Sequence, residues 1–277
     1  MQPIIPTIIF LPSVDSTNNY AMGQVHAGLA THEMAWFARE QYAGKGQRNK
    51  QWTALPGENI TMSIALQPSF LKVSEQFQLS AAIALSAVDF FGKYAGEETK
   101  IKWPNDIYWR DRKAGGILIE NVIGVNEVNS LPTTDNATIQ SSISGHPASV
   151  ISNYKWAIAG IGININQTEF PDSLVNPVSL KQITGKKFDT FQLAGELHQQ
   201  VLKRFEQLQT NGFKEIYNDY LSQLYKINQT HKFKKENRVF EALVKNVSPA
   251  GKLVLQHSIE EEYDFGEIEW VGIKNKN

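Results

Sequence analysis

The 277-residue sequence contains no cysteine, and this absence removes several classes of protein at once. Disulfide-stapled scaffolds, cysteine nucleophiles and thiolate zinc sites all need that side chain. The sequence also lacks an excess of either charge, because 27 basic and 28 acidic residues give a formal net charge of −1. A chain without a basic field has little to hold a nucleic-acid backbone, so we expect no nucleic-acid partner.

Long hydrophobic runs are absent as well. No apolar stretch approaches the roughly 20 residues that a membrane-spanning helix needs. The N-terminal segment lacks the basic start and the unbroken apolar run of a secretory signal. We therefore expect a cytoplasmic protein with no membrane partner, in agreement with the lack of cysteine. Hydrophobic residues make up 42% of the chain, which is enough for a packed core in one large domain with a smaller one.

Hydrophobic periodicity predicts an α+β organisation for most of the chain. Short β-branched or alternating runs predict strands at residues 8–11, 34–40, 59–66, 99–102, 107–109, 117–122 and 154–165. Helical spacing of apolar residues predicts helices at about 16–25, 77–94, 191–208 and 213–224. Residues 124–152 are rich in Asn, Ser, Thr and Pro without an apolar period, which predicts a long loop between two strands.

The chain changes character from about Thr230. Short runs at 238–247, 252–256, 263–265 and 268–270, separated by turn residues, are typical of a small β-barrel. We place a boundary near 225–230, which gives domains 1–228 and 229–277. The predicted fold class is α+β, with a small all-β domain appended.

Two polar segments lie near the N-terminus. The run Asp15-Ser16-Thr17-Asn18-Asn19 follows a strand and begins a helix, so it supplies either an ordinary helix cap or a set of donors for a polar ligand. Residues 40–52 carry glycines together with Lys45, Arg48 and Lys50. Such a loop either cradles a phosphate or forms a solvated hairpin turn, and its spacing is not that of a Walker loop.

Two further segments carry lysines beside rigid or small residues. In Lys102-Trp103-Pro104-Asn105-Asp106, the carboxylate of Asp106 either holds a hydrated Mg²⁺ or closes a turn. Lys113 begins an apolar strand beside the paired glycines Gly115 and Gly116. A lysine at such a place either offsets carboxylate and phosphate charge or is a plain turn residue.

Together and in this order, these segments resemble the biotin protein ligases. The likeness spans most of residues 8–270. It is carried by Ser-Thr-Asn at 16–18, the G-K-G-Q-R loop ending at Trp52, K-W-P-N-D at 102–106, R-K-x-x-G-I-L with Glu120, and G-x-G-I-N at 160–164. The resemblance implies a mixed β-sheet flanked by helices, like that of class II aminoacyl-tRNA synthetases, followed by an SH3-like β-barrel.

The resemblance also implies roles for the matching residues. The biotin-binding positions are Ser16, Thr17, Asn18, Gln41, Gly44, Lys45, Gly46, Lys113, Gly115 and Gly116. The ATP-binding positions are Lys45, Gly46, Gln47, Arg48, Trp52, Lys102, Asn105, Asp106, Lys113 and Asn164. The residues expected to act in catalysis are Lys113, Lys45 and Asp106, and Asp106 is also the expected magnesium ligand.

The implied reaction activates biotin with ATP and Mg²⁺ to biotinyl-5′-AMP, releases pyrophosphate, and transfers biotin to a lysine of a biotin carboxyl carrier protein. The resemblance is compatible with a monomer or a homodimer. Lys45, Gln47, Asn49 and Lys50 depart from the usual arginine- and glycine-rich loop. Since the Ser-Thr-Asn motif begins at residue 16, we expect a single-function ligase without the N-terminal DNA-binding domain of ligases that also repress transcription.

Three alternatives stay open. A lipoate ligase would share the scaffold and the reaction class, although the K-W-P-N-D run and the G-K-G-Q-R loop resemble the biotin branch. A biotin-sensing or adapter module would bind without turnover, although Lys113 and Asp106 favour chemistry. A bifunctional repressor would show salt-dependent DNA binding.

Overall fold

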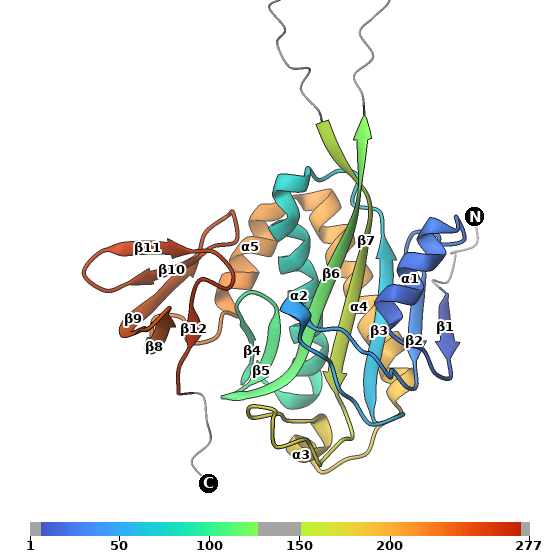
Figure 1. Cartoon of the computed structure of the whole chain (residues 1–277), viewed down its shortest axis with the longest axis horizontal. Helices are drawn as coiled ribbons and strands as arrows, with labels where there is room; N and C mark the ends of the chain where they lie inside the picture. Colours follow the sequence, from blue (N-terminus) through green and yellow to red (C-terminus); the bar gives the residue numbers. More distant parts are fainter. Residues whose placement is uncertain (1–6, 127–150, 273–277) are drawn as a thin grey trace, which may run out of the picture.

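The computed structural model describes residues 7–126 and 151–272. Seven strands of this part of the chain form one mixed sheet in the order β1-β2-β3-β7-β6-β5-β4, in which β1 and β2 are parallel and all other neighbours are antiparallel (Figure 1). The strands are β1 (Ile8–Leu11), β2 (Ala35–Ala38), β3 (Asn59–Leu66), β4 (Thr99–Lys102), β5 (Asp106–Trp109), β6 (Arg112–Asn126) and β7 (Ile151–Asn164). The predicted mixed sheet is confirmed.

The two longest of the described helices pack on one face of this sheet, and the first helix packs on the other. The helices are α1 (Thr17–His26), α2 (Gln76–Ala95), α3 (Leu180–Thr184), α4 (Thr190–Asn211) and α5 (Phe213–Ser222), with single 3₁₀ turns at Gln47–Asn49 and Val73–Glu75. Leu197, Val201 and Phe205 recur at helical spacing along α4 and are buried. Each such side chain contributes about 1.5–3 kcal/mol of burial free energy, so this stripe fixes the helix on the sheet.

The two faces of the sheet differ in composition. On β3, Ile60, Met62 and Ile64 belong to the core beneath α2 and α4, whereas Thr61 and Ser63 alternate with them and point to the opposite face. On β7, Gly160 and Gly162 occupy that opposite face between core residues. Helix α1 covers part of this face, over β2, β3 and a part of β7. The rest is left open by the helices.

A second sheet follows the helices. Its strands are β8 (Thr230–Lys235), β9 (Arg238–Val247), β10 (Leu253–Gln256), β11 (Glu260–Tyr263) and β12 (Glu269–Trp270), in the antiparallel order β11-β10-β9-β8-β12. The predicted small all-β unit is confirmed. The edge strands β11 and β12 are not neighbours, so the described residues form an open sheet rather than a closed SH3-like barrel.

The C-terminal sheet is attached beside β4 and α5, as Figure 1 shows. The Tyr217 hydroxyl donates to the Val247 carbonyl at 2.6 Å, and Trp103 Nε1 donates to the Gly251 carbonyl at 2.8 Å. The backbone N–H of Ile101 donates to the Gln223 carbonyl. The first two bonds hold the small sheet against α5 and the Trp-Pro turn, and the third ties the chain that leads to the small sheet to β4.

Several boundaries differ from the sequence predictions. Strands β6 and β7 extend into both ends of the predicted loop 124–152, because ladder hydrogen bonds join backbone groups and tolerate polar side chains. Residues 127–150 of that predicted loop lie outside the described residues. The strand expected at 263–265 runs over Glu260–Tyr263 instead, where a polar edge shows little alternation. Strand β8, with Phe233 as its one buried side chain, and the short helix α3 were not predicted.

No helix within the described ranges combines the length and the apolar character that crossing a bilayer requires.

Candidate functional site

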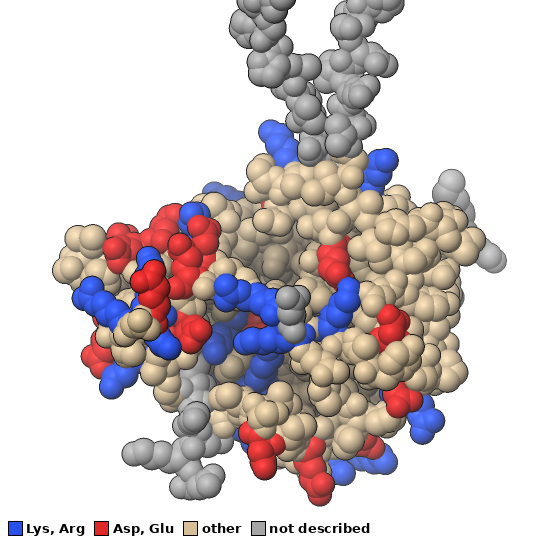
Figure 2. All heavy atoms as spheres, viewed as in Figure 1, with Lys and Arg blue, Asp and Glu red and all other residues tan. Residues whose placement is uncertain are grey.

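The open part of the sheet forms the bottom of a cavity of about 930 Å³. Its walls come from β3, β5, β6 and β7, from the loop that follows β2, from residues 173–177, and from the end of the C-terminal sheet. Figure 2 shows lysine and arginine atoms gathered around a hollow on this side of the molecule. The cavity therefore lies between the main sheet and the C-terminal unit.

Nearly all residues predicted from the sequence converge on this cavity. All but Gly44 and Gly115 line it: Ser16, Thr17, Asn18, Gln41, Lys45, Gly46, Gln47, Arg48, Trp52, Lys102, Asn105, Asp106, Lys113, Gly116 and Asn164. They come from segments that are far apart in the sequence, and the order of strands brings them together.

Gly44 and Gly115 have packing roles beside the cavity. A Cβ at Gly115 would lie 2.6 Å from Ile163 Cδ1 and 2.7 Å from the Gly162 carbonyl oxygen. A Cβ at Gly44 would meet the Trp52 carbonyl oxygen. Both glycines permit close approach of neighbouring backbone. Their expected place beside biotin stays a prediction.

Four neutral polar side chains, which we call the floor, form one hydrogen-bonded group: Thr17, Asn18, Gln41 and Ser63. Gln41 Oε1 accepts from the Thr17 N–H at 2.7 Å and lies 3.0 Å from Thr17 Oγ1. The Ser63 hydroxyl lies 2.7 Å from Thr17 Oγ1 and 2.6 Å from Asn18 Oδ1. Ser63 is completely buried. Since these bonds join α1, β3 and the start of the loop, the floor keeps its shape without a ligand.

Ser16 stands at the N-cap position of α1, as predicted, but makes no side-chain cap hydrogen bond. Its side chain is buried and lines the cavity. Helix α1 therefore begins at the floor with its N-terminal backbone groups nearby. Of the two interpretations of this segment, the geometry favours a ligand-facing helix start.

The floor is connected to the loop through Asn18. Asn18 fits against β7 because Gly160 has no side chain, and a Cβ there would overlap the Asn18 amide. Asn18 Nδ2 donates to Glu120 Oε2 at 2.7 Å, and the other oxygen of Glu120 pairs with Lys45 Nζ at 3.3 Å. Lys45 is thus held at the edge of the floor by a carboxylate from β6.

Five basic side chains, which we call the cationic rim, line the other half of the cavity: Lys45, Arg48, Lys50, Lys102 and Lys113. The only carboxylates among the lining residues are Asp106 and Glu269. With Glu120, which pairs with Lys45, five positive charges face three negative ones, so the excess is two. Such an excess within one cavity favours a polyanionic ligand.

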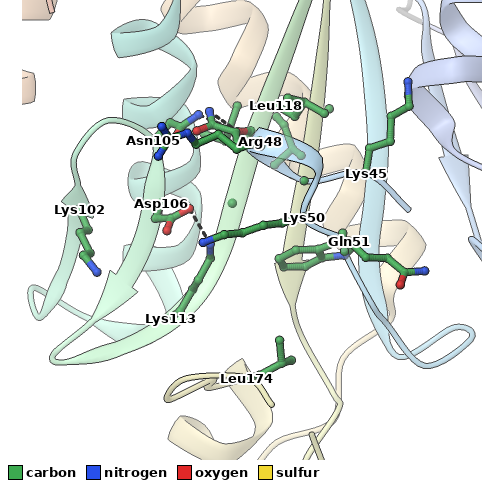
Figure 3. A pocket seen from close by; sticks show the side chains of 18 of the residues that line it. Lys45, Arg48, Lys50, Gln51, Lys102, Asn105, Asp106, Lys113, Leu118 and Leu174 are labelled. Carbon is green, nitrogen blue, oxygen red and sulfur yellow. Dashed lines mark hydrogen bonds and ion pairs between the residues drawn. The ribbon is translucent and has the colours of Figure 1, made fainter. Parts of the chain in front are cut away.

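Lys113 and Asp106 meet in the centre of the cationic rim (Figure 3). Lys113 Nζ donates to Asp106 Oδ1 at 2.6 Å, across neighbouring strands β6 and β5. Asn105 Nδ2 donates to the Ile117 carbonyl at 2.7 Å, and Asn164 Nδ2 donates to the Val178 carbonyl at 3.1 Å. These amides fix the strand ends and the segment after β7, so the ion pair sits on a rigid support.

Lys102 is the most buried member of the cationic rim. Its Nζ donates to the Tyr108 hydroxyl at 3.1 Å and lies 4.7 Å from the Tyr108 ring centroid and 5.5 Å from that of Trp270. Burial lowers the pKa of Lys102 to about 8; Asp106 opposes this shift, and the charges of Lys113 and Lys50 add to it. A second anion near Lys102 would stabilise its protonated form.

The loop after β2 closes over the open face through Trp52. The Trp52 ring lies flat against Gly162 of β7, where a Cβ would overlap the indole. Trp52 Nε1 is buried and has no protein partner. In the same loop, Gln47 Nε2 lies 3.4 Å from the Ile117 carbonyl, a weak contact.

Two comparisons with known sequences show what the chain is similar to. A model of the Biotin/lipoate A/B protein ligase family matches residues 10–130. The chain is 33% identical over 186 residues to the bifunctional ligase/repressor BirA of Bacillus subtilis, covering 65% of this chain and 48% of that protein. It is 27% identical over 255 residues to a biotin–[acetyl-CoA-carboxylase] ligase of Paracoccus denitrificans, covering 89% and 92%. The chain is thus similar to the biotin/lipoate protein ligase family over residues 10–130, and to one biotin–[acetyl-CoA-carboxylase] ligase over most of its length.

The matched part of the chain spans about half the length of BirA, the first of these relatives. Its fold matches the biotin protein ligase from Aquifex aeolicus, solved in complex with biotin and ATP, with a TM-score of 0.71 at 22% identity, over 95% of this chain and 97% of the other. The biotin protein ligase from Leishmania major matches with a TM-score of 0.60 at 20% identity, over 94% and 98%. At these identities the likeness establishes the shared fold.

Some residues that line or support the cavity were not found from the sequence. Thr61, which lines the cavity, and Ser63, which supports the floor from within, alternate with Met62 and Ile64. The polar positions of that strand therefore carried a signal for a second surface. Glu120 was noted as part of a motif, without its contact to Lys45. Ser173–Val175 also line the cavity, together with five residues of the C-terminal unit: Phe265, Gly266, Ile268, Glu269 and Trp270. No local pattern identified them.

Proposed function

We propose that the protein activates biotin with ATP to biotinyl-5′-AMP, releases pyrophosphate, and transfers biotin to a lysine of a biotin carboxyl carrier protein. One observation carries this proposal: a single cavity joins a buried, neutral, hydrogen-bonding floor to a cationic rim with an excess of two positive charges. A neutral polar ring fits the first part, and a carboxylate with a polyphosphate fits the second.

The positions of the side chains suggest how the ligands lie. The ureido group of biotin offers N–H donors and a carbonyl acceptor to the floor and to Ser16. The apolar tail then runs past Gly116, and its carboxylate reaches Lys113. Asn164, Asn105 and Lys102 lie farther along the same cavity, on the side where we place the nucleotide.

In the first step, a carboxylate oxygen of biotin attacks the α-phosphorus of ATP. The bond from that phosphorus to the bridging oxygen breaks, and pyrophosphate leaves with the electron pair. Two anions must approach each other, so the protein contributes positioning and positive charge through Lys113 and Lys45. Trp52 and the loop exclude water from the mixed anhydride.

In the second step, a neutral amine of the carrier attacks the acyl carbon. The new N–C bond forms while the C–O bond to AMP breaks, and the amine must lose a proton. Asp106 lies 2.6 Å from Lys113 Nζ, so it is the carboxylate closest to the centre of the cationic rim, and we propose it as the proton acceptor.

Magnesium fits this site as a partner of the nucleotide. Within residues 7–126 and 151–272, no group of three or more acidic, histidine or cysteine side chains is arranged to hold a metal. Mg²⁺ is usually held by one or two carboxylates together with substrate phosphates, and Asp106 supplies a carboxylate inside the cationic rim. Bound there, Mg²⁺ would neutralise charge on the polyphosphate.

The organisation we propose follows from the same arrangement. Residues 1–228 form the catalytic domain and residues 229–277 a smaller domain that completes the cavity wall. The protein acts in the cytoplasm, as a monomer or a homodimer, on a protein substrate whose acceptor lysine enters the open side of the cavity.

The proposal is tested by pyrophosphate release with ATP, Mg²⁺ and either biotin or lipoate. Biotin-dependent release should fall by at least about 100-fold in Lys113→Ala, because a charge that stabilises the transition state is lost. Lys100→Ala is the matched control, since Lys100 lies on β4 of the same sheet, outside the cavity, and bonds to Gln223.

Three outcomes contradict parts of the proposal. Release with lipoate alone would place the protein on the lipoate branch. No release with either acid, from wild-type protein shown to be folded by circular dichroism, would leave a binding-only role. Near-normal release by a folded Lys113→Ala variant would exclude the role assigned to Lys113.

A further inference from the structure

One residue of the loop after β2 reaches across to the C-terminal sheet. Arg48 Nη2 donates to the Gly266 carbonyl at 3.2 Å, although the two residues are 218 positions apart. The Arg48 guanidinium carbon also lies 5.5 Å from the centroid of the Phe265 ring. Arg48 was predicted to contact the nucleotide, whereas its side chain is engaged by protein groups of the other unit.

Phe265 is positioned to receive this contact. Its ring meets the Trp103 ring edge-to-face at a centroid distance of 5.8 Å, and Trp103 is itself anchored to Gly251 by its indole N–H. Phe265 is nonetheless 47% exposed. The ring therefore stands at the cavity wall between the Trp-Pro turn and the loop, with a cation near it.

Arg48 and Gly266 both have unusual backbone conformations at this contact. Arg48 adopts the left-handed conformation, with φ 55° and ψ 46°, which non-glycine residues rarely occupy without compensating contacts. Gly266 has φ +93°, and a Cβ there would overlap the Arg48 guanidinium. Arg48, in the left-handed conformation, thus packs against a position whose backbone conformation and lack of space favour glycine.

We propose that Arg48 is a positioning residue that fixes the Tyr42–Gln51 loop against the C-terminal sheet through Phe265 and Gly266. The consequence for activity rests on the proposed function: the contact sets how long the adenylate is retained. The C-terminal sheet then acts on the reaction through the loop that carries Lys45. Arg48 itself stays off the reacting atoms.

The first test needs no ligand and no activity. Endoproteinase Lys-C cuts after Lys45 and Lys50, which flank Arg48, so Arg48→Met removes no cleavage site. We expect cleavage of the folded protein at these lysines to be about fivefold faster in Arg48→Met, because a cation–π contact and a charge-assisted hydrogen bond are lost. Phe265→Leu should have a similar effect.

Arg110→Met is the matched control. Arg110 is also a left-handed arginine, with φ 52°, and its guanidinium carbon lies 4.5 Å from the Trp109 ring centroid, yet it does not line the cavity. Its loss should leave cleavage at Lys45 and Lys50 unchanged. If both arginine variants speed cleavage equally, general destabilisation explains the effect and the proposal is wrong.

A double variant tests the partnership directly. Arg48→Met combined with Phe265→Leu should speed cleavage no more than either change alone, since both remove one contact. Additive effects would show that the two residues act separately and would overturn the proposal, as would wild-type cleavage rates in Arg48→Met.

The second test measures dissociation of biotinyl-adenylate preformed on the enzyme. Dissociation should be about fivefold faster in Arg48→Met, partly restored in Arg48→Lys, and unchanged in Arg110→Met, with kcat altered less than the dissociation rate. Unchanged dissociation in Arg48→Met would reject the link to retention. Wild-type protein that forms no adenylate would reject the proposed function, and the protease experiment would still test the contact.

Discussion

The floor and the cationic rim differ in how their polar groups are partnered. Every member of the floor bonds to another member within 3.0 Å, and the group spans a helix, a strand and a loop. In the rim, like charges share a cavity, and only Asp106 and Glu269 among the lining residues oppose them. One half is complete without a ligand, and the other carries charge that a ligand would neutralise.

This difference separates specificity from affinity. A preformed network rejects a ligand that cannot match its donors and acceptors, because unpaired buried polar groups are costly. A cluster of like charges instead gains free energy from any polyanion that relieves repulsion. In the rim, burial lowers the pKa of Lys102, and repulsion from Lys113 and Lys50 lowers it further. We therefore expect substitutions in the rim to change mainly the KM for ATP, and substitutions in the floor to change mainly the KM for biotin.

The largest effect within this comparison is expected at Lys102. Lys102→Met should raise the KM for ATP by about 10–30-fold at pH 7, because a charge-assisted contact is lost, and should leave the KM for biotin near normal. Lys100→Met is the control from the same strand. An equal change in both KM values would contradict the division between rim and floor.

The pKa of Lys102 also predicts that the KM for ATP depends on pH. Lys102 has a pKa of about 8, so it is charged at pH 7 and largely neutral at pH 9 in the free protein. The KM for ATP should therefore rise from pH 7 to pH 9 in the wild type. Lys102→Arg stays charged throughout and should flatten that rise, which steady-state kinetics at constant ionic strength would show.

Ser63→Ala probes the floor. The Ser63 hydroxyl lies within hydrogen-bond distance of Thr17 and Asn18, so its loss leaves buried polar atoms short of a partner. The KM for biotin should rise by about tenfold, with little change for ATP. Ser86→Ala, which removes a buried hydroxyl from α2 outside the cavity, should alter the melting temperature without altering either KM. A larger effect on ATP than on biotin would argue against a separate floor.

The smallest expected effect concerns Gln47, a neutral residue next to the cationic rim. Gln47→Arg adds a positive charge to the cavity lining and should slow dissociation of the adenylate by about threefold. Gln209→Arg, on the exposed side of α4, is the charge-matched control. Faster dissociation in Gln47→Arg would show that added repulsion outweighs added attraction.

Local patterns were sufficient where a residue's own segment determines its position. Lys113 and Asp106 were predicted because polar residues beside glycine, proline and apolar strands are unusual, and the structure pairs them at 2.6 Å. The main strands and long helices followed from periodicity for the same reason. Strand β8 was missed because one buried aromatic in a lysine-rich run gives no alternation.

Contacts between distant segments could not be predicted in this way. Arg48 meets Gly266 only because the C-terminal sheet packs beside β4 and β5, and nothing in either segment encodes the other. The open edges of the small sheet have the same origin, since closure depends on how β11 and β12 are placed in space. Roles of individual cavity residues remain proposals that the variants above test.

Gly160 and Gly162 of β7 set the spacing between the floor and Trp52. Asn18 rests on the first and Trp52 on the second, so the step from the floor to the loop equals one two-residue repeat of an extended chain, roughly 6.6 Å. That length is set by peptide geometry and does not depend on loop conformation. Changes in the loop can therefore alter how long a ligand stays bound, whereas the distance between these two contact points is set by the backbone of β7.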